Sequence, residues 1–176
     1  MSFSEILLSL VLNSYLDLII DNHREIKNYN KEQLYSLCLY KLLGRKFRIQ
    51  ITGARDYTNE ETIKSALKEY ISEYCVVVHG NCSGADKLCG KIAKKKGFKV
   101  EEFPAEWNKY GRTAGPIRNI QMLNIINNYI FNPDVVLVFH PCLEKSKGTK
   151  HCANEAKKRG LNIKYFIWIH ISLICI

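Results

Sequence analysis

The stretch 76–86 carries the clearest chemical potential, because it reads as an apolar strand, a polar loop with two glycines and the first turn of a helix. Amides at a helix start lack intrahelical partners and the helix dipole adds positive charge, so a phosphate is favoured there. Gly80, Ser83 and Gly84 would let the backbone approach it, and Asp86 can accept from a ribose hydroxyl. The alternatives are an ordinary glycine-bounded turn and, for Asp86, a favourable charge at a helix N-terminus.

A second loop, 53–56, follows the preceding apolar stretch and contains Gly53, Arg55 and Asp56. A planar guanidinium can hold a phosphate through two parallel hydrogen bonds, so Arg55 is a candidate ligand-binding residue. The alternative is a surface ion pair, or an aspartate that caps the turn.

Two further loops precede helices and add five candidates. Gly115 comes just before Arg118 and Asn119, which would lie one turn into a helix and reach a base or a phosphate; solvent exposure or a cap is the alternative. Gly148 and Thr149 repeat the helix-start pattern, although a capping role alone would explain Thr149.

Aromatic and histidine side chains near these loops have weaker claims. Trp107 and Tyr110 can stack on a base, but core packing is the expected role of Trp107. His79 and His140 both end apolar strands and could act as an acid or a base, although a hydrogen-bonded structural histidine is the more common case.

The chain has 176 residues and a formal net charge of +9, which favours acidic partners such as nucleotides or nucleic acid. Two basic runs, 94–96 and 157–159, each precede a glycine and fit last helical turns, where cations offset the helix dipole. That placement favours a small ligand in a crevice over a nucleic acid on the basic surface.

Seven cysteines without a regular framework favour a reducing compartment, and therefore a cytoplasmic location. Cys75, His79, Cys82 and Cys89 are close in sequence, but they contain no Cys-x-x-Cys pair, so we expect no metal site.

Both ends of the chain are apolar, yet neither predicts a membrane span. The stretch 6–20 is interrupted by Asn13 and Asp17 and has no basic leader, which argues against a signal peptide or a span. The stretch 166–176 is too short to span a bilayer as a helix, and we expect a buried edge strand, with membrane contact or self-association as alternatives.

The elements that must position the candidates alternate between strand and helix from residue 46 onward, which predicts an α/β fold: a Rossmann-like three-layer sandwich with a mainly parallel sheet of about five strands. Ligands bind outside the carboxyl ends of the strands in such sheets, so one crevice is expected. We expect a helical N-terminal extension (1–45), this domain (46–169) and an apolar tail (170–176). The expected strands are 47–52, 75–79, 99–103, 134–139 and 162–169.

Four separated segments together resemble the YspA, or cpYpsA-related, branch of the SLOG superfamily, and residues 103–107 match it in kind. The segments are Gly53-Ala54-Arg55-Asp56, His79-Gly80-Asn81-Cys82-Ser83-Gly84-Ala85-Asp86, Ala114-Gly115-Pro116-Ile117-Arg118-Asn119 with Met122, and Ser146-Lys147-Gly148-Thr149. The resemblance covers about residues 47–166. It implies a Rossmann-like domain with a pocket for a nucleotide or a nucleotide-derived ligand, including NAD derivatives, and no required cofactor.

The wider superfamily implies two alternative functions. One is a DprA-like module that binds single-stranded nucleic acid, and the other is a phosphoribohydrolase of the lonely-guy type. Those enzymes carry a glutamate three residues past the Gly-Thr pair, where this chain has Cys152. A carboxylate must stabilise the cationic sugar during cleavage. Asp86 and Glu155, one helical turn past Cys152, are the candidate catalytic residues, with Asp56 and Glu106 as alternatives. The sequence leaves open whether the chain forms a homo-oligomer.

Overall fold

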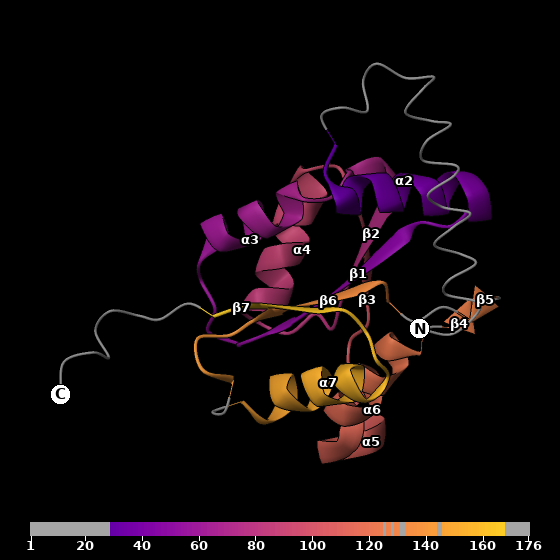
Figure 1. Cartoon of the computed structure of the whole chain (residues 1–176). Helices are drawn as coiled ribbons and strands as arrows, with labels where there is room; N and C mark the ends of the chain where they lie inside the picture. Colours follow the sequence, from indigo (N-terminus) through magenta and orange to yellow (C-terminus); the bar gives the residue numbers. More distant parts are fainter. Residues whose placement is uncertain (1–28, 125, 128, 131–132, 144–145, 168–176) are drawn as a thin grey trace.

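The computed structural model describes residues 29–124, 126–127, 129–130, 133–143 and 146–167 (Figure 1). Its centre is a five-stranded, fully parallel sheet with the order β3-β2-β1-β6-β7. The strands are β1 (Phe47–Gly53), β2 (Cys75–His79), β3 (Lys99–Glu102), β6 (Val135–Phe139) and β7 (Ile163–Phe166). The predicted Rossmann-like α/β sandwich is therefore confirmed.

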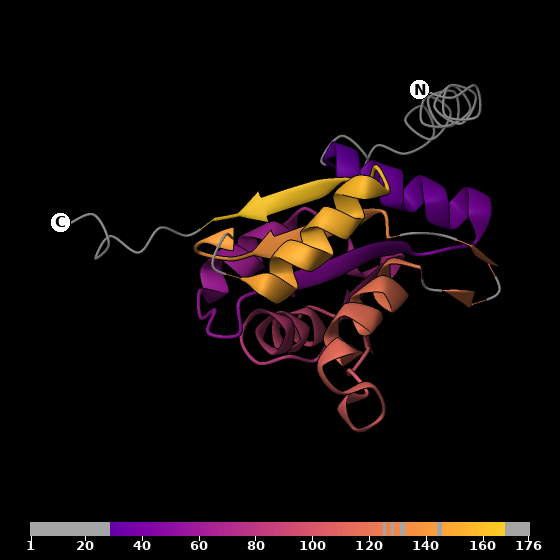
Figure 2. The same cartoon turned by 90° about the horizontal axis from the view of Figure 1, so that it is seen from below.

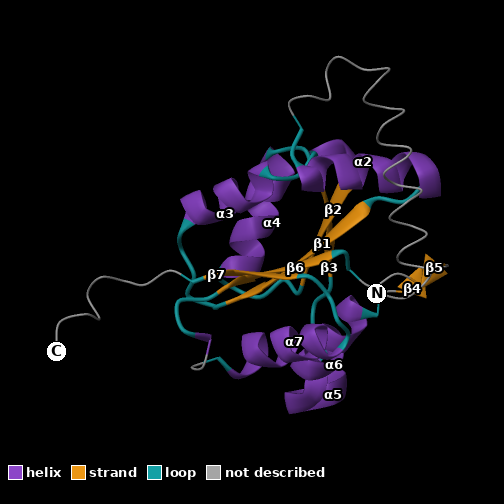
Figure 3. Ribbon diagram, in the orientation of Figure 1, coloured by secondary structure: helices purple, strands orange, loops and turns teal. Residues whose placement is uncertain are grey.

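Helices cover both faces of this sheet, which makes three layers (Figures 1 and 2). One layer contains α2 (Lys31–Leu43), α3 (Glu60–Lys68) and α4 (Ala85–Lys95). The other contains α5 (Trp107–Tyr110), α6 (Ala114–Leu123) and α7 (Lys147–Lys158). Two short 3₁₀ turns, Ser72–Tyr74 and Gly111–Thr113, and a small antiparallel pair, β4 (Ile126–Asn127) with β5 (Tyr129–Ile130), complete the described elements (Figure 3).

The sheet has its topological switch point between β1 and β6. The chain starts at the centre with β1, moves outward through β2 to β3, and then returns to place β6 on the other side of β1. Gly53 lies opposite Phe139 in the register of β1 and β6, so the two strands end together. A crevice between such strand ends is where open α/β sheets bind their ligands.

The three central strands are buried on both faces. Strands β2 and β6 are accordingly apolar apart from His79, whereas β1 also buries Gln50 and Thr52. On β6, Val135 and Leu137 pack into the core under α3 and α4, while Val136 and Val138 pack against α6 and α7. Because side chains alternate along the strand, β6 contributes to the hydrophobic packing on both faces of the sheet.

Strand boundaries agree closely with the prediction, exactly for β2 and within one residue at each end for β1, β3 and β6. The last strand ends at Phe166 rather than at residue 169. The buried edge strand expected at 166–176 is not seen at Ile167, which is 62% exposed, and residues 168–176 lie outside the described residues.

The N-terminal extension is seen from residue 29 onward, and the prediction for residues 1–28 lies outside the described residues. Asn30 and Gln33 form a capping box at the start of α2, and the helix ends at Gly44, which has a left-handed φ of 62° as a C-cap. Leu39 of α2 is buried in the core beside β1. Within the described ranges, no helix has the length and apolarity needed to cross a membrane.

Helix α6 begins two residues before Pro116. A proline is typical of the first position of a helix, but Pro116 is the third residue of α6, because the 3₁₀ turn Gly111–Thr113 runs directly into the helix. A proline fits there because first-turn amides have no intrahelical acceptor. Ile120 is 37% exposed, and Ile126 belongs to β4 rather than to the helix.

The loop after β2 packs so closely on the loop after β1 that replacing Gly84 with alanine should destabilise the fold. Gly84 has a φ of 70°, and a Cβ would lie 2.3 Å from the Ala54 carbonyl oxygen. Strain and overpacking together should lower the free energy of unfolding by about 3 kcal/mol.

The matched control is Gly148→Ala, because a Cβ at Gly148 would meet nothing within 4 Å. It should leave stability unchanged or raise it by less than about 1 kcal/mol, as alanine favours helix. Urea unfolding compares the two variants. Equal effects would show that the contact between the two loops is absent.

Candidate functional site

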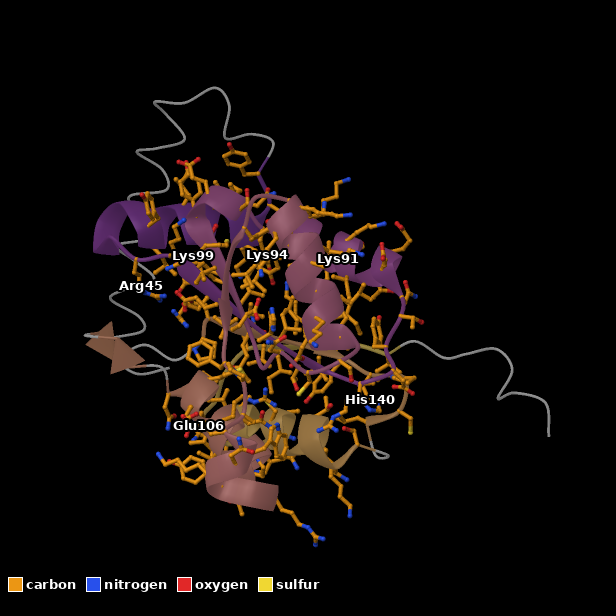
Figure 4. All side chains as sticks on the ribbon, turned by 180° about the vertical axis from the view of Figure 1, so that it is seen from behind. Arg45, Lys91, Lys94, Lys99, Glu106 and His140 are labelled. Atoms are coloured by element: carbon orange, nitrogen blue, oxygen red, sulfur yellow. The ribbon has the colours of Figure 1, made fainter. Side chains whose placement is uncertain are left out.

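A cavity of about 980 Å³ opens at the carboxyl ends of β1 and β6, at the switch point. The loop after β1, the first turns of α6 and α7, and the loop after β6 form its walls. His140 lies at its margin, directly after β6 (Figure 4). The volume is at the upper end of the range of small-molecule sites, about 300–1,000 Å³.

Most of the ligand-binding residues predicted from the sequence line this cavity. Nine of the twelve expected ligand-binding residues line it: Gly53, Arg55, Asp56, Asp86, Gly115, Arg118, Asn119, Gly148 and Thr149. The other three lie just outside, with Gly80 and Ser83 on one adjoining hollow and Gly84 on another.

Backbone amides in the loop after β2 donate hydrogen bonds to side chains of the protein itself, which changes the interpretation of this loop as a phosphate-binding site. Asp86 Oδ2 accepts hydrogen bonds from the Gly80 amide at 3.1 Å and the Cys82 amide at 3.2 Å. The Asn81 amide donates to His79 Nδ1 at 3.1 Å. The carboxylate of Asp86 therefore occupies the position that a bound anion would take in the loop.

Burial raises the pKa of Asp86 to about 6, although the Cys82 and Gly80 amides and the charges of Arg118 and Arg55 oppose that shift. Asp86 is only 5% exposed. Because desolvation outweighs these favourable contacts, its carboxylate exchanges a proton close to neutral pH.

Arg118 is buried within the site instead of facing solvent, which contradicts the alternative of solvent exposure. Its guanidinium donates to the carbonyl oxygen of Gly80 and, at 3.3 Å, to that of Phe103. Its Nε donates to Asn119 Oδ1 at 3.0 Å, and Asn119 Nδ2 donates to the Gly148 carbonyl at 3.3 Å. Gly80 must lack a side chain because a Cβ would overlap this guanidinium.

The start of α7 forms another wall. Ser146 caps the helix, since its hydroxyl oxygen accepts from the Thr149 amide at 3.1 Å, so the capping role predicted for Thr149 is wrong. Thr149 instead donates its hydroxyl to the Gly53 carbonyl at 3.0 Å and ties the helix to β1. The amides of Lys147 and Gly148 have no acceptor among the described residues, and the space around Gly148 is open.

Three basic side chains line the cavity without a partner. Within the described ranges, Arg55, Arg112 and Lys147 make no hydrogen bond or ion pair. Asp56 and Asp86 are the acidic side chains of the lining and Arg118 is a fourth basic one, so the wall carries an excess of positive charge. The sequence analysis did not single out Arg112, Lys147 or His151. The available signal was Lys147, a cation in the first turn of a helix, where the dipole disfavours positive charge.

Of the aromatic and histidine candidates, Trp107 and His140 line the cavity, whereas Tyr110 does not. Trp107 is 50% exposed on the cavity wall, so the expected core packing is wrong: the short helix α5 lies outside both cores. Tyr110 lies under Lys109 and is not part of the lining. His140 Nδ1 accepts from the Cys142 amide at 2.9 Å, and burial lowers its pKa against the opposing charge of Asp56.

Glu155, the second predicted catalytic residue, lies outside the cavity. It lines a separate shallow hollow with His151 and Lys158. Hydrogen bonds from Lys158 and Arg159 lower its pKa to about 2. In the part of the chain that the structure describes, no group of three or more His, Cys, Asp or Glu side chains is placed to hold a metal ion.

The fold and the position of the cavity define a Rossmann-like α/β protein with a ligand crevice at its switch point. Residues 47–110 match the YspA, cpYpsA-related SLOG family. The chain is 37% identical over 127 residues to the Gene 61 protein of Mycobacterium phage D29, a match that covers 68% of this chain and 95% of the phage protein. No solved structure matches the chain.

The chain therefore belongs to the YspA, cpYpsA-related family of the SLOG superfamily, as the sequence motifs predicted. Membership of this superfamily suggests a nucleotide-related ligand.

The environment of Asp86 generates a pH prediction. Below about pH 4 the carboxyl is protonated in both the folded and the unfolded state. Between about pH 4 and 6 the unfolded state ionises first, so stability falls as pH rises, by about 3 kcal/mol in total, and is then constant. Asp86→Asn keeps an oxygen for the two amides and carries no charge. Its stability relative to wild type should therefore increase over this pH interval in urea unfolding.

Asp86→Ala is the comparison, because it leaves the Gly80 and Cys82 amides without their acceptor and should cost about 2 kcal/mol. A difference between wild type and Asp86→Asn that does not change with pH would contradict the assigned pKa.

Proposed function

We propose that this protein binds a nucleotide or nucleotide-derived ligand in the cavity at the carboxyl ends of β1 and β6. The observation that carries the proposal is a set of three cations around one cavity, Arg55, Arg112 and Lys147, which have no hydrogen-bond or ion-pair partner in the part of the chain that the structure describes. Outside the cavity, Lys94 and Lys158 are paired with Glu102 and Glu155, and lysines without such a pair among the described residues, such as Lys95 and Lys96, are exposed at the end of a helix. Cations held together without an acidic partner favour an anionic ligand.

The arrangement of donors supports one orientation of the ligand. The loop after β2 is filled by Asp86, whereas the first turn of α7 offers the Lys147 and Gly148 amides, the Lys147 ammonium group and the positive end of the helix dipole. The phosphate is therefore assigned to α7. Trp107, half exposed on the wall, supplies a stacking surface for the base. Asp56 remains available to accept from sugar hydroxyls.

Hydrolysis of the ligand would rest on Asp86, since Glu155 is held in ion pairs outside the cavity. A carboxylate that lines the cavity and ionises near neutral pH can stabilise a developing sugar cation. Incubation with nucleoside monophosphates and chromatography of the free base tests this step. Release of base that Asp86→Asn does not diminish would exclude Asp86 as its source.

Nucleic-acid binding through the basic runs has less support. Both runs lie in the last turns of α4 and α7, whereas the first turns of these helices line the cavity. In Figure 4, Lys91 and Lys94 lie on the α4 layer, whereas Glu106 lies on the opposite layer. The small-ligand proposal is therefore the one that we adopt.

Ligand binding should depend on the cavity cations. The double substitution Arg112→Gln and Lys147→Gln removes two charges without removing bulk. It should weaken the binding of 5′-AMP by at least about tenfold, because hydrogen bonds to charged groups contribute roughly 1.5–3 kcal/mol each. Isothermal titration calorimetry gives the dissociation constants.

Lys157→Gln is the matched control, since Lys157 is exposed in the last turn of the same helix and away from the cavity. It should leave affinity unchanged. Equal losses in the control and in the double variant, or a panel of nucleoside phosphates and ADP-ribose that shows no binding at all, would overturn the proposed function.

Stacking on Trp107 can be observed directly. The chain contains two tryptophans, and Trp168→Phe leaves Trp107 as the sole indole. A nucleotide that stacks on the exposed indole should quench its emission in proportion to the bound fraction measured by calorimetry. Binding without any change in this emission would place the base elsewhere in the cavity.

A further inference from the structure

A second, smaller hollow adjoins the cavity. It has a volume of about 310 Å³ and lies over the loop after β2, beside Pro104 and Ala105. Arg55, Cys82 and Trp107 line both spaces. Because the same three side chains line both, the cavity and the side hollow adjoin at these residues, and the two together are called the cleft.

The lining of this side hollow contains a basic side chain, Arg55, and no acidic one. Asn81 and Ser83 also line it, and their side chains make no hydrogen bond with the described residues. A guanidinium, an amide and a hydroxyl without partners form a set of donors. Such a set fits an anionic group, and phosphate oxygens accept from all three donor types.

The third hollow at Arg55 differs in that it contains acidic side chains. It lies between the start of α3 and α4, and it is lined by Asp56 and Glu60 as well as by Arg55, Lys87 and Lys91. The two carboxylates repel a phosphate and offset two of the three cations, so an additional anion gains little. The observations therefore favour the hollow over the loop after β2 as the second subsite.

We propose that the cleft is bipartite and takes a ligand with two separated phosphate groups. One phosphate lies at the start of α7, the second lies in the side hollow against Asn81 and Ser83, and Arg55 lies between them. The ligand class is a nucleoside that carries phosphates on two different hydroxyls, either as a free nucleoside bisphosphate or as a 5′-phosphorylated dinucleotide. This inference rests on the proposed function, because the first phosphate is the one assigned there.

The test compares 5′-AMP with adenosine 3′,5′-bisphosphate and with the dinucleotide pApA by calorimetry. Wild-type protein should bind at least one of the doubly phosphorylated ligands about tenfold more tightly than 5′-AMP. The double substitution Asn81→Gly and Ser83→Ala should remove that gain, so that the variant binds 5′-AMP and the doubly phosphorylated ligands with equal affinity. Glycine is used at Asn81 because this residue has a φ of 56°, which glycine adopts without strain.

Ser72→Ala is the matched control, since Ser72 lies in the 3₁₀ turn before β2 and lines none of the three hollows. It should keep the full gain. A preference for the bisphosphate or for pApA assigns the second phosphate to one of the two chemical sources.

Two outcomes overturn the inference while the proposed function stands: equal affinity for all three ligands, or a gain that persists in the Asn81→Gly, Ser83→Ala protein. Absence of any binding by 5′-AMP and by both longer ligands overturns the proposed function itself, and this inference with it.

Discussion

The buried guanidinium of Arg118 is the contact on which the geometry of the site depends. It joins α6 to the loop after β2 through Gly80 and to the end of β3 through Phe103. Through Asn119 it reaches the Gly148 carbonyl at the start of α7. Arg118 and Asn119 together thus link the two halves of the sheet across the switch point. Hydrogen bonds from all three guanidinium nitrogens make the burial of a permanent charge tolerable.

Around this contact, the polar groups of the site fall into two sets. The first set is satisfied within the protein: Asp86 holds the loop after β2, and Thr149 holds α7 to Gly53. The second set has no partner among the described residues and faces the cavity or its side hollow, as Arg55 and Lys147 do. Structural groups bond to one another, and the groups left over are the ones available to a ligand.

The sequence predicts the fold because strand and helix patterns are local. The β-branched run in β2 and the cap residue Asn59 before α3 indicate their elements without tertiary information. The cavity was predictable to the same degree, since strand ends in a parallel sheet meet at one edge. The exposure of Trp107 was not, because it depends on how a four-residue helix sits against distant elements.

Individual roles within the site were the least predictable part. In sequence, Gly80 resembles a glycine that lets a phosphate approach the backbone. In the structure, a side chain at this position would overlap the guanidinium of Arg118, which is 38 residues away in sequence. Glu155 lies outside the cavity because a displacement by three helical positions moves a side chain nearly one turn, about 4.5 Å, along α7 and away from its first turn. Only the three-dimensional arrangement separates these cases.

The close packing of Gly84 on the backbone of Ala54 and Arg55 has a consequence for how the cleft responds to a ligand. Two loops whose backbones are in contact, with Ala85 donating its amide to the Ala54 carbonyl at 3.0 Å, move as one unit. The wall that carries Arg55 is therefore preorganised, and little conformational entropy remains to be lost there upon association. Differences in affinity between ligands should then appear mainly as differences in dissociation rate, and association should proceed at nearly the same rate for all of them.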